Sequence, residues 1–350
     1  MLRHFRGPFI FALICFALAA WYGWSQAHLL IGMVRILWIV GVLSVLEVSL
    51  SFDNAVVNAT VLEDMDEIWQ KRFLTWGMVF AVYGMYIVFP LAIVAVAAGL
   101  GPVEAVRLSL TDPEHYEQIV SSAHVGIAGF GGAFLGLVGL KFFFDKDKEV
   151  HWITVIEEWA ARFSALPALE IVVILLSLWG VSRLLPEHQA LSFLVAGLFG
   201  VVAFVLVEGL GEMLAHRDER MKDAGTAVQR GLGGFIYLNV LDASFSFDAV
   251  IGAFALSNNM VVIALGLSIG AMFVRSLTLL LVQKGTLAEY RYLEHGAFWA
   301  ILALAAIMLI SARYEVPETL TGVIGAALIA ISLWWSVRHK RRHREANPAD

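Results

Sequence analysis

The chain has 350 residues, of which 59% are hydrophobic and only 15% are charged, and its mean hydropathy is +0.77. This composition excludes an ordinary soluble domain and indicates a polytopic membrane protein. The single cysteine, Cys15, excludes a disulfide framework and a thiolate metal site, and a net charge of −6 gives no reason to expect nucleic acid as a partner.

Ten segments of the chain are long and apolar enough to be candidate transmembrane helices, each of which needs roughly 20 residues to cross a bilayer. We therefore predict an all-α polytopic fold with about ten transmembrane helices in the lipid bilayer. The predicted spans cover approximately residues 8–25, 31–60, 73–100, 124–144, 168–185, 190–213, 233–256, 260–283, 295–312 and 318–337.

The distribution of Lys and Arg supports this number of spans. If the amino terminus lies in the cytoplasm, 19 of the 24 Lys and Arg residues fall on the cytoplasmic side. Such an excess is typical of the cytoplasmic loops of membrane proteins, and one misplaced span would remove it. We predict a multi-pass protein of the bacterial cytoplasmic (inner) membrane with both termini in the cytoplasm. Residues 338–350 then form a basic cytoplasmic tail that contacts lipid headgroups.

The first predicted span has two interpretations. The sequence MLRHFRG, an apolar run and then Ser25-Gln26-Ala27 resemble a signal peptide with a small-x-small cleavage site. The apolar run is somewhat longer than the usual signal core of roughly 7–15 residues, which favours a retained helix. Cleavage would leave the topology of the other spans unchanged.

A polar motif occurs in the second predicted span and again in the seventh. The first copy reads LEVSLSFDNAVVNA from Leu46, and the second reads LDASFSFDAVIGAFA from Leu241. At an offset of 195 residues, the second copy places Asp242 where the first has Glu47. By the same offset Asp53 corresponds to Asp248, so both carboxylates of the motif are repeated.

This repetition predicts the domain organisation. The two motif spans are separated by an odd number of crossings, so their helices run in opposite directions. We predict two inverted-topology repeats, residues 1–187 and 188–337, each with its motif in the second span. A pseudo-two-fold axis in the membrane plane would bring the two motifs to a common centre.

The motifs supply oxygen ligands within the apolar spans. Carboxylates are costly inside a membrane, so they usually face the protein interior and mark an ion or proton path. Oxygen ligands without His or Cys suit Mg²⁺, Ca²⁺ or Mn²⁺ and disfavour zinc and copper. The predicted metal ligands are Glu47, Asp53, Asn54, Asp242 and Asp248, and the supporting residues are Ser49, Ser51, Asn58, Asn239, Ser244 and Ser246.

Helical geometry constrains how these residues could share one site. A straight helix could not aim Glu47 and Asp53 at one point, because they lie on different faces. Either the motif helix is broken between them, or the two motif helices cross. No Lys or Arg is adjacent in sequence, so the carboxylates must be partly protonated or balanced by a bound cation. Cation entry and protonation would then compete, which offers a route to proton coupling.

Four further polar residues lie within or near the predicted spans. Glu208, Glu212 and Lys141 are candidates for a cytoplasmic gate or ion relay, and the alternative is that they reach the membrane interface. Arg275 is a candidate counter-charge to a motif carboxylate or to Glu208, or it too reaches the interface.

Two other stretches have informative patterns. Residues 126–139 read GIAGFGGAFLGLVG, which allows close helix packing and is the surface on which we expect a mobile bundle to slide. In residues 145–167, Trp152, Ile156, Trp159 and Phe163 recur at helical spacing among charged residues. This pattern predicts an amphipathic helix that lies on the membrane surface.

Both motifs resemble those of a known family. EVSLSFDNA, from Glu47, resembles the ExxLSxDNA motif of the TerC integral membrane protein family. DASFSFD, from Asp242, resembles that family's second motif, an acidic residue followed by F-[AS]-x-D. The resemblance covers most of the chain, roughly from the second span onward. The sequence departs from the common pattern after Asp248, where it has Ala-Val-Ile-Gly and many members have Ser-Ile-Pro-Ala.

The resemblance implies manganese handling, either as Mn²⁺ efflux or as the supply of metal to exported enzymes. It also implies metal-ligand roles for Glu47, Asp53, Asn54, Asp242 and Asp248. The longer chain and the altered second motif indicate a divergent branch that keeps the fold.

Two functional hypotheses follow. The first is a secondary transporter that exports a hard divalent cation, with Mn²⁺ favoured and Ca²⁺ or Mg²⁺ as alternatives, through a carboxylate-lined site between the two repeats. The second is a membrane metallation or accessory factor that binds metal for exported partner proteins without net transport. An enzyme is not expected, because no Ser–His pair or HExxH motif lies in any span. Assembly as a homo-oligomer is left open.

Overall fold

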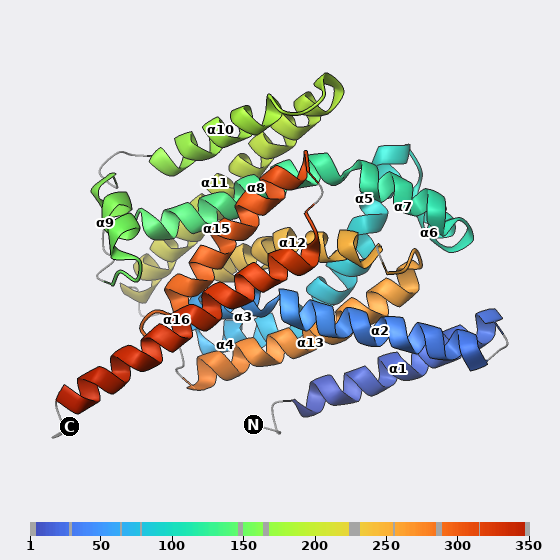
Figure 1. Cartoon of the computed structure of the whole chain (residues 1–350), viewed down its shortest axis with the longest axis horizontal. Helices are drawn as coiled ribbons and strands as arrows, with labels where there is room; N and C mark the ends of the chain where they lie inside the picture. The colour runs from blue at the N-terminus through green and yellow to red at the C-terminus, as the bar shows by residue number, and fades with distance from the viewer. Residues whose placement is uncertain are drawn as a thin grey trace. The chain divides into compact units, whose positions relative to one another are not determined.

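The computed structural model describes residues 5–27, 30–63, 65–77, 79–145, 150–163, 168–223, 232–254, 256–284, 289–314 and 316–346. In these residues all regular structure is helical and no strand occurs, so the predicted all-α class is confirmed (Figure 1). The helices are α1 Arg6–Ala27, α2 Leu30–Leu50, α3 Phe52–Glu63, α4 Glu67–Arg72, η1 Phe73–Gly77, η2 Phe80–Val88, α5 Phe89–Ala98, α6 Pro102–Thr111, α7 Pro113–Ser122, α8 His124–Phe143, α9 Thr154–Phe163, α10 Leu169–Ser182, α11 Glu187–Asp223, α12 Leu232–Phe254, α13 Met260–Lys284, α15 Leu293–Ser311 and α16 Glu318–Ala346.

Seven of the described helices are long and apolar enough to cross a membrane. Their apolar stretches are Arg6–Ser25, Leu30–Ser49, His124–Phe143, Glu187–Leu210, Met260–Lys284, Leu293–Ser311 and Leu320–Lys340. Three shorter apolar helices, Tyr83–Ala95, Leu169–Ser182 and Leu232–Ala243, lie within the other three predicted spans. A multi-helix membrane protein is therefore supported, and the number of ten spans stays a prediction.

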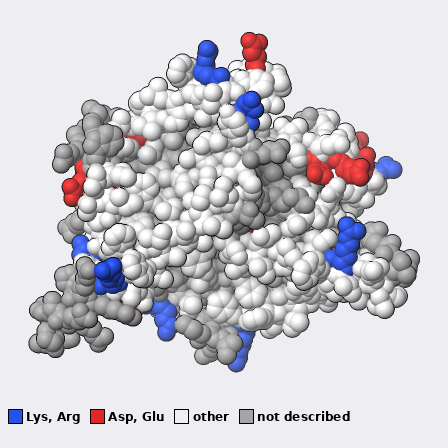
Figure 2. All heavy atoms as spheres, in the orientation of Figure 1, with Lys and Arg blue, Asp and Glu red and all other residues white. Residues whose placement is uncertain are grey.

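The surface has the character expected of a protein surrounded by lipid. Large apolar side chains point outward, among them Leu13, Trp21 and Trp38, whose exposed fractions are 71%, 69% and 73%. On the face drawn in Figure 2, charged atoms are few and most of the surface is uncharged. Soluble monomers rarely expose apolar surface on this scale, whereas lipid tails solvate it without penalty.

The chain packs into two compact units. Unit 1 comprises Met1–Ser51, Met65–His124 and Arg217–Leu280, and unit 2 comprises Phe52–Asp64, Val125–His216 and Leu281–Asp350. Each unit takes segments from both predicted repeats. The units therefore do not coincide with residues 1–187 and 188–337, and the repeat boundaries stay a prediction.

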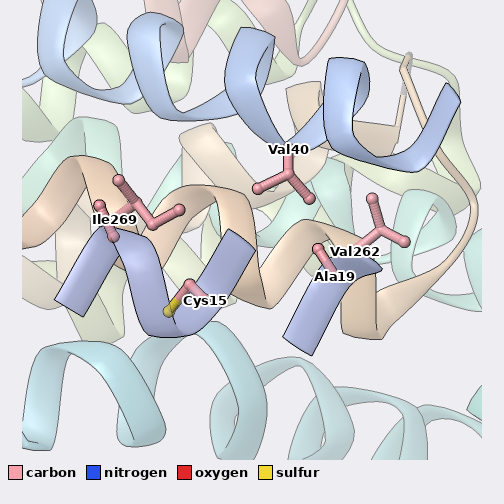
Figure 3. Packing of buried hydrophobic residues seen from close by; sticks show 6 residues of the cluster. Cys15, Ala19, Val40, Val262 and Ile269 are labelled. Atoms are coloured by element: carbon pink, nitrogen blue, oxygen red, sulfur yellow. The ribbon is translucent and has the colours of Figure 1, made fainter. Parts of the chain in front are cut away.

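The core of unit 1 contains a cluster shared by α1, α2 and α13. Cys15 and Ala19 of α1 pack with Val40 of α2 and with Val262 and Ile269 of α13, and all five are buried (Figure 3). Small side chains on α1 let the three helices approach closely, as is typical of helix packing in membranes.

A polar contact fixes the far end of α1. The Nδ2 amide of Asn259 donates to the hydroxyl of Tyr22 at 2.7 Å. Together with the buried Cys15 and Ala19, this contact makes α1 part of the packing of unit 1. Whether α1 is retained or cleaved stays as the sequence left it.

In unit 2, the glycine-rich stretch of α8 packs closely, as predicted. A Cβ on Gly129 would lie 2.6 Å from the backbone oxygen of Phe193, and a Cβ on Gly200 would lie 2.4 Å from that of Phe130. Helices α8 and α11 therefore meet backbone to backbone. These glycines are enclosed within unit 2, which differs from their expected role as a sliding surface.

The predicted amphipathic helix is present as α9, but one of its charged residues points inward. Glu157 is buried at 1% exposure, whereas Ile156 is 48% exposed. The backbone N–H groups of Trp152 and Ile153 donate to the Glu157 carboxylate at 3.1 and 3.2 Å. The side chains of Trp159 and Phe163 lie outside the described residues, so the membrane-surface location stays a prediction.

Candidate functional site

The two motif helices differ in their backbone. In the first copy α2 ends at Leu50, Ser51 adopts a turn, and α3 begins at Phe52. In the second copy α12 runs unbroken from Leu232 to Phe254. The predicted break between Glu47 and Asp53 is thus present in the first copy only.

Glu47 is the buried acidic residue of the first motif. Its Oε1 atom accepts hydrogen bonds from the Ser51 hydroxyl at 2.7 Å and from the Tyr86 hydroxyl at 2.9 Å. Its Oε2 atom is buried and has no hydrogen-bond partner among the described side chains. Gly270 of α13 gives this side chain its space, because a Cβ there would lie 2.4 Å from Glu47 Cβ.

Asp242, the equivalent of Glu47 in the second motif, forms a buried ion pair with Arg275. Arg275 Nη2 lies 2.8 Å from Asp242 Oδ2, and Arg275 Nη1 donates to the backbone oxygen of Phe73 at 2.9 Å. The guanidinium also lies over the Phe73 ring, with its carbon 4.3 Å from the ring centroid. Arg275 is therefore the counter-charge to a motif carboxylate, which was one of the predicted alternatives.

An uncommon backbone conformation supplies two of these contacts. Phe73 and Tyr86 belong to η1 and η2, which are wound as π-helix. π-Helical turns are rare in proteins overall, but those that occur are often found at functional sites. Gly77 of η1 leaves room for the guanidinium, since a Cβ there would lie 2.8 Å from Arg275 Nη1.

The two motifs meet within unit 1. Glu47 and Asp242 lie close enough for their charges to act on each other. Tyr86 joins them, because its hydroxyl donates to Glu47 and lies near Ser246. Ser246 also donates to the backbone oxygen of Asp242 at 2.7 Å. The structure thus brings together the repeat-related carboxylates Glu47 and Asp242, with Ser51 bonded to the first and Ser246 bonded to the backbone of the second.

Asn239 lies one turn before Asp242 on α12 and is also buried. Its Nδ2 donates to the backbone oxygen of Phe235 at 2.6 Å, and its Oδ1 has no hydrogen-bond partner in the part of the chain that the structure describes. This oxygen is a further acceptor beside the second motif.

The remaining predicted ligands lie elsewhere or are not described. Ser49 is on the exposed side of α2, where its hydroxyl donates to the backbone oxygen of Val45 at 2.8 Å. Asn54 and Asn58 are buried on α3, which belongs to unit 2. The side chains of Asp53, Ser244, Asp248 and Glu212 lie outside the described residues, so their roles stay predictions.

The predicted gate residues form a separate pair. Lys141 of α8 and Glu208 of α11 make an ion pair inside unit 2. The Lys141 side chain is 52% exposed, so this pair lies at the surface of unit 2. Glu208 is therefore not the partner of Arg275.

Tyr86 and the Phe73 carbonyl could not be recognised as site groups from the sequence. A tyrosine and a phenylalanine in an apolar span are ordinary residues, and no motif marks either one. The π-helical winding that aims them at Glu47 and Arg275 has no sequence signature of its own. Glu157 was also missed, because neighbouring charges made it look like part of a solvated helix face.

The polar groups of the site are oxygen atoms and the guanidinium of Arg275. Within the described residues, no group of three or more His, Cys, Asp and Glu side chains converges as a metal cage would require. Two carboxylates, two serine hydroxyls and a tyrosine hydroxyl do converge around Glu47 and Asp242. This arrangement can bind a cation or a proton at the unpaired oxygen of Glu47.

Comparison with known proteins places the chain in one family. The model of the family described as protein of unknown function (DUF475) matches residues 52–343. The chain belongs to this family. The matched range contains Asp242 and Arg275 and begins just after Glu47. No curated protein and no solved structure matches the chain.

Proposed function

We propose that this DUF475 protein is a secondary transporter that exports a hard divalent cation, with Mn²⁺ as the favoured substrate and Ca²⁺ or Mg²⁺ as alternatives. One observation carries the proposal. Glu47 and Asp242, which occupy equivalent positions of a repeated motif, lie close together in a buried part of unit 1.

The energetics of burial favour an ion-binding role. Two carboxylates out of water repel each other and lose their hydration, so a fold keeps them only with compensation. Arg275 compensates Asp242, but Oε2 of Glu47 has no hydrogen bond among the described residues. Ordinary structural carboxylates have both oxygens satisfied, so a cation that shares Glu47 and Asp242 would explain why this one is not.

The donor chemistry favours a hard cation. Serine and tyrosine hydroxyls and carboxylates are oxygen ligands of the kind that Mn²⁺, Mg²⁺ and Ca²⁺ prefer. The motif resemblance to the TerC family, in which manganese is handled, favours Mn²⁺ among them. Asp53 and Asp248 stay ligands that the repeated motif predicts.

The proposed architecture is ten transmembrane helices in two inverted repeats, with both termini on the cytoplasmic side of a bacterial inner membrane. The short apolar helices in the third, fifth and seventh predicted spans support this number. The third and eighth predicted spans share unit 1, and the fourth, fifth, ninth and tenth share unit 2, as an offset of five spans requires. The first and sixth predicted spans lie in different units, and the second span is divided between the two units, so the units agree with the proposed repeat only in part.

Metal flux in vesicles tests the proposal. The purified protein would be placed in inside-out vesicles, and uptake of Mn²⁺, Ca²⁺, Mg²⁺ and Zn²⁺ would be measured with and without a pH gradient. We expect saturable Mn²⁺ uptake, lost in Glu47→Gln and in Asp242→Asn. Glu63→Gln is the matched control, because Glu63 is exposed at the end of α3. Stimulation by the pH gradient would establish proton coupling.

Two results would contradict the proposal, the first its site and the second transport itself. Normal flux in a Glu47→Gln/Asp242→Asn double variant would remove the site from the mechanism. Tight Mn²⁺ binding that depends on Glu47, without flux of any ion, would instead support a metallation factor for exported partner proteins.

A further inference from the structure

Arg275 is the one described basic side chain that reaches a motif carboxylate, and it is held at three points. Its guanidinium contacts Asp242 Oδ2, the backbone oxygen of Phe73 and the Phe73 ring, and the residue is 5% exposed. All three contacts lie within unit 1. Two of them, both with Phe73, do not depend on Asp242.

The net charge of the described side chains at this site can be balanced by only one added cation at a time. With both carboxylates ionised, Glu47, Asp242 and Arg275 carry a net charge of −1. A divalent ion bound by Glu47 and Asp242 would lie within a few ångströms of the guanidinium. Like charges at that separation repel strongly in a site shielded from water. Arg275 and the ion therefore compete for Asp242.

We propose that Arg275 is a resident counter-cation, which occupies Asp242 while the site is empty and is displaced when the substrate cation binds. The displaced guanidinium keeps its hydrogen bond to the Phe73 oxygen and its place over the Phe73 ring. This inference rests on the proposed transport function, and it assigns Arg275 as a positioning residue that sets the charge of the empty site.

The consequence concerns the return of the empty carrier. An empty site with two unbalanced carboxylates is costly in low dielectric, and neutralising Asp242 lowers that cost. A carrier that must reorient while empty therefore needs Arg275. A carrier that reorients only with its cation bound does not need it, because the cation supplies the positive charge.

Two flux assays separate these steps. Net uptake of Mn²⁺ into vesicles without internal Mn²⁺ requires return of the empty carrier, whereas exchange of radioactive Mn²⁺ for internal Mn²⁺ does not. In Arg275→Gln we expect net uptake to fall by at least about tenfold, since an unpaired buried charge shifts an equilibrium by that factor or more. The rate of exchange should stay within about twofold of that of the unmodified protein, because the carrier with bound cation reorients without the Arg275–Asp242 ion pair.

Binding gives an independent readout. Loss of the competitor should tighten Mn²⁺ binding to Arg275→Gln by about tenfold, as measured from the electron paramagnetic resonance signal of free Mn²⁺. Arg35→Gln is the matched control for both assays, because Arg35 is exposed on α2 of the same unit. It should leave net uptake, exchange and affinity unchanged.

A second variant covers the case in which Arg275→Gln does not fold. Arg275→Lys keeps the positive charge but lacks the planar fork that reaches Asp242 and Phe73 together. We expect it to retain net uptake and to bind Mn²⁺ more tightly than the unmodified protein. In the unmodified protein, Mn²⁺ should also shift the infrared bands of isotope-labelled arginine, and Arg275→Lys should remove that shift.

The outcomes are distinguishable. A parallel loss of net uptake and exchange in a folded Arg275→Gln protein, or an unchanged Mn²⁺ affinity, would show that Arg275 is only structural and would overturn the inference. If the unmodified protein neither moves nor binds Mn²⁺, the proposed function fails, and the resident counter-cation fails with it.

Discussion

Each unit contains a buried glutamate, and the two carboxylates differ in how their oxygen atoms are hydrogen-bonded. Glu157 in unit 2 uses both carboxylate oxygens. Oε1 accepts from Ile153 N at 3.2 Å and from Trp299 Nε1 at 3.1 Å, and Oε2 lies 3.1 Å from Trp152 N and 3.0 Å from His295 Nδ1. Glu47 in unit 1 concentrates its two hydrogen bonds on Oε1 and leaves Oε2 without one among the described residues.

The difference separates a structural carboxylate from a candidate ligand. Glu157 ties α9 to α15, and the four contacts given above are to backbone amides or ring nitrogens of that junction. Glu47 holds an unpaired acceptor beside a second acidic residue, Asp242. Proteins keep such costly arrangements at functional sites, where stability is given up for activity.

The largest expected effect comes from comparing two single variants, Glu157→Gln and Glu47→Gln. In Glu157→Gln one carboxylate oxygen becomes an NH₂ group. This group cannot accept the hydrogen bonds that the oxygen accepted, so the donors around it lose their partner. We expect the free energy of unfolding to fall by about 2–4 kcal/mol, because each buried donor left unpaired costs about 1–3 kcal/mol. Thermal unfolding in detergent, followed by the loss of helical circular dichroism, measures this change.

Glu47→Gln should behave in the opposite way. Its amide oxygen can replace Oε1 as acceptor for Ser51 and Tyr86, and its NH₂ group takes the place of the unpaired oxygen. Because a buried negative charge is removed, we expect stability to change by less than about 1 kcal/mol or to rise. Equal destabilisation by the two substitutions would break the contrast and make Glu47 a structural residue as well.

The next effect tests the packing that holds Arg275 in the site. Gly77→Ala places a methyl group 2.8 Å from Arg275 Nη1 and 3.0 Å from the Phe73 ring, so the guanidinium must shift. Overpacking of this kind costs about 1–3 kcal/mol, and we expect Mn²⁺ affinity to change along with stability. Gly180→Ala is the control, because a Cβ there meets nothing within 4 Å and should be neutral or slightly stabilising. If the two substitutions have the same effect on affinity, the position of Arg275 does not control the site.

The sequence predicted the part of the site that repeats. Glu47 and Asp242 could be paired without a structure, because equivalent positions of an inverted repeat lie near one axis. The break after Leu50 was also predictable, since serine competes for backbone hydrogen bonds. The same reasoning was wrong for α12, where Ser246 bonds to the backbone oxygen of Asp242 without interrupting the helix.

Contacts that depend on packing could not be predicted. Arg275 could have reached Asp242, Glu208 or the interface, and only the three-dimensional arrangement selects Asp242. Tyr86 and the Phe73 oxygen reach the site through π-helical turns. Glu157 finds a partner in His295, 138 positions along the chain. No local pattern encodes a contact of that separation.

The narrowest change isolates the hydrogen bond that Tyr86 donates to Glu47. Tyr86→Phe keeps the buried ring and removes one donor from Oε1, which leaves Ser51 as its remaining donor. A single hydrogen bond to a charged group contributes about 1.5–3 kcal/mol. If Tyr86 positions Glu47 for a cation, Mn²⁺ affinity should weaken by about tenfold while the protein stays folded, as titration of free Mn²⁺ would measure. If Tyr86 is only a packing residue like the donors around Glu157, stability should fall and the affinity per folded molecule should stay constant. Tyr83→Phe is the matched control, because Tyr83 is 57% exposed on the same π-helical segment.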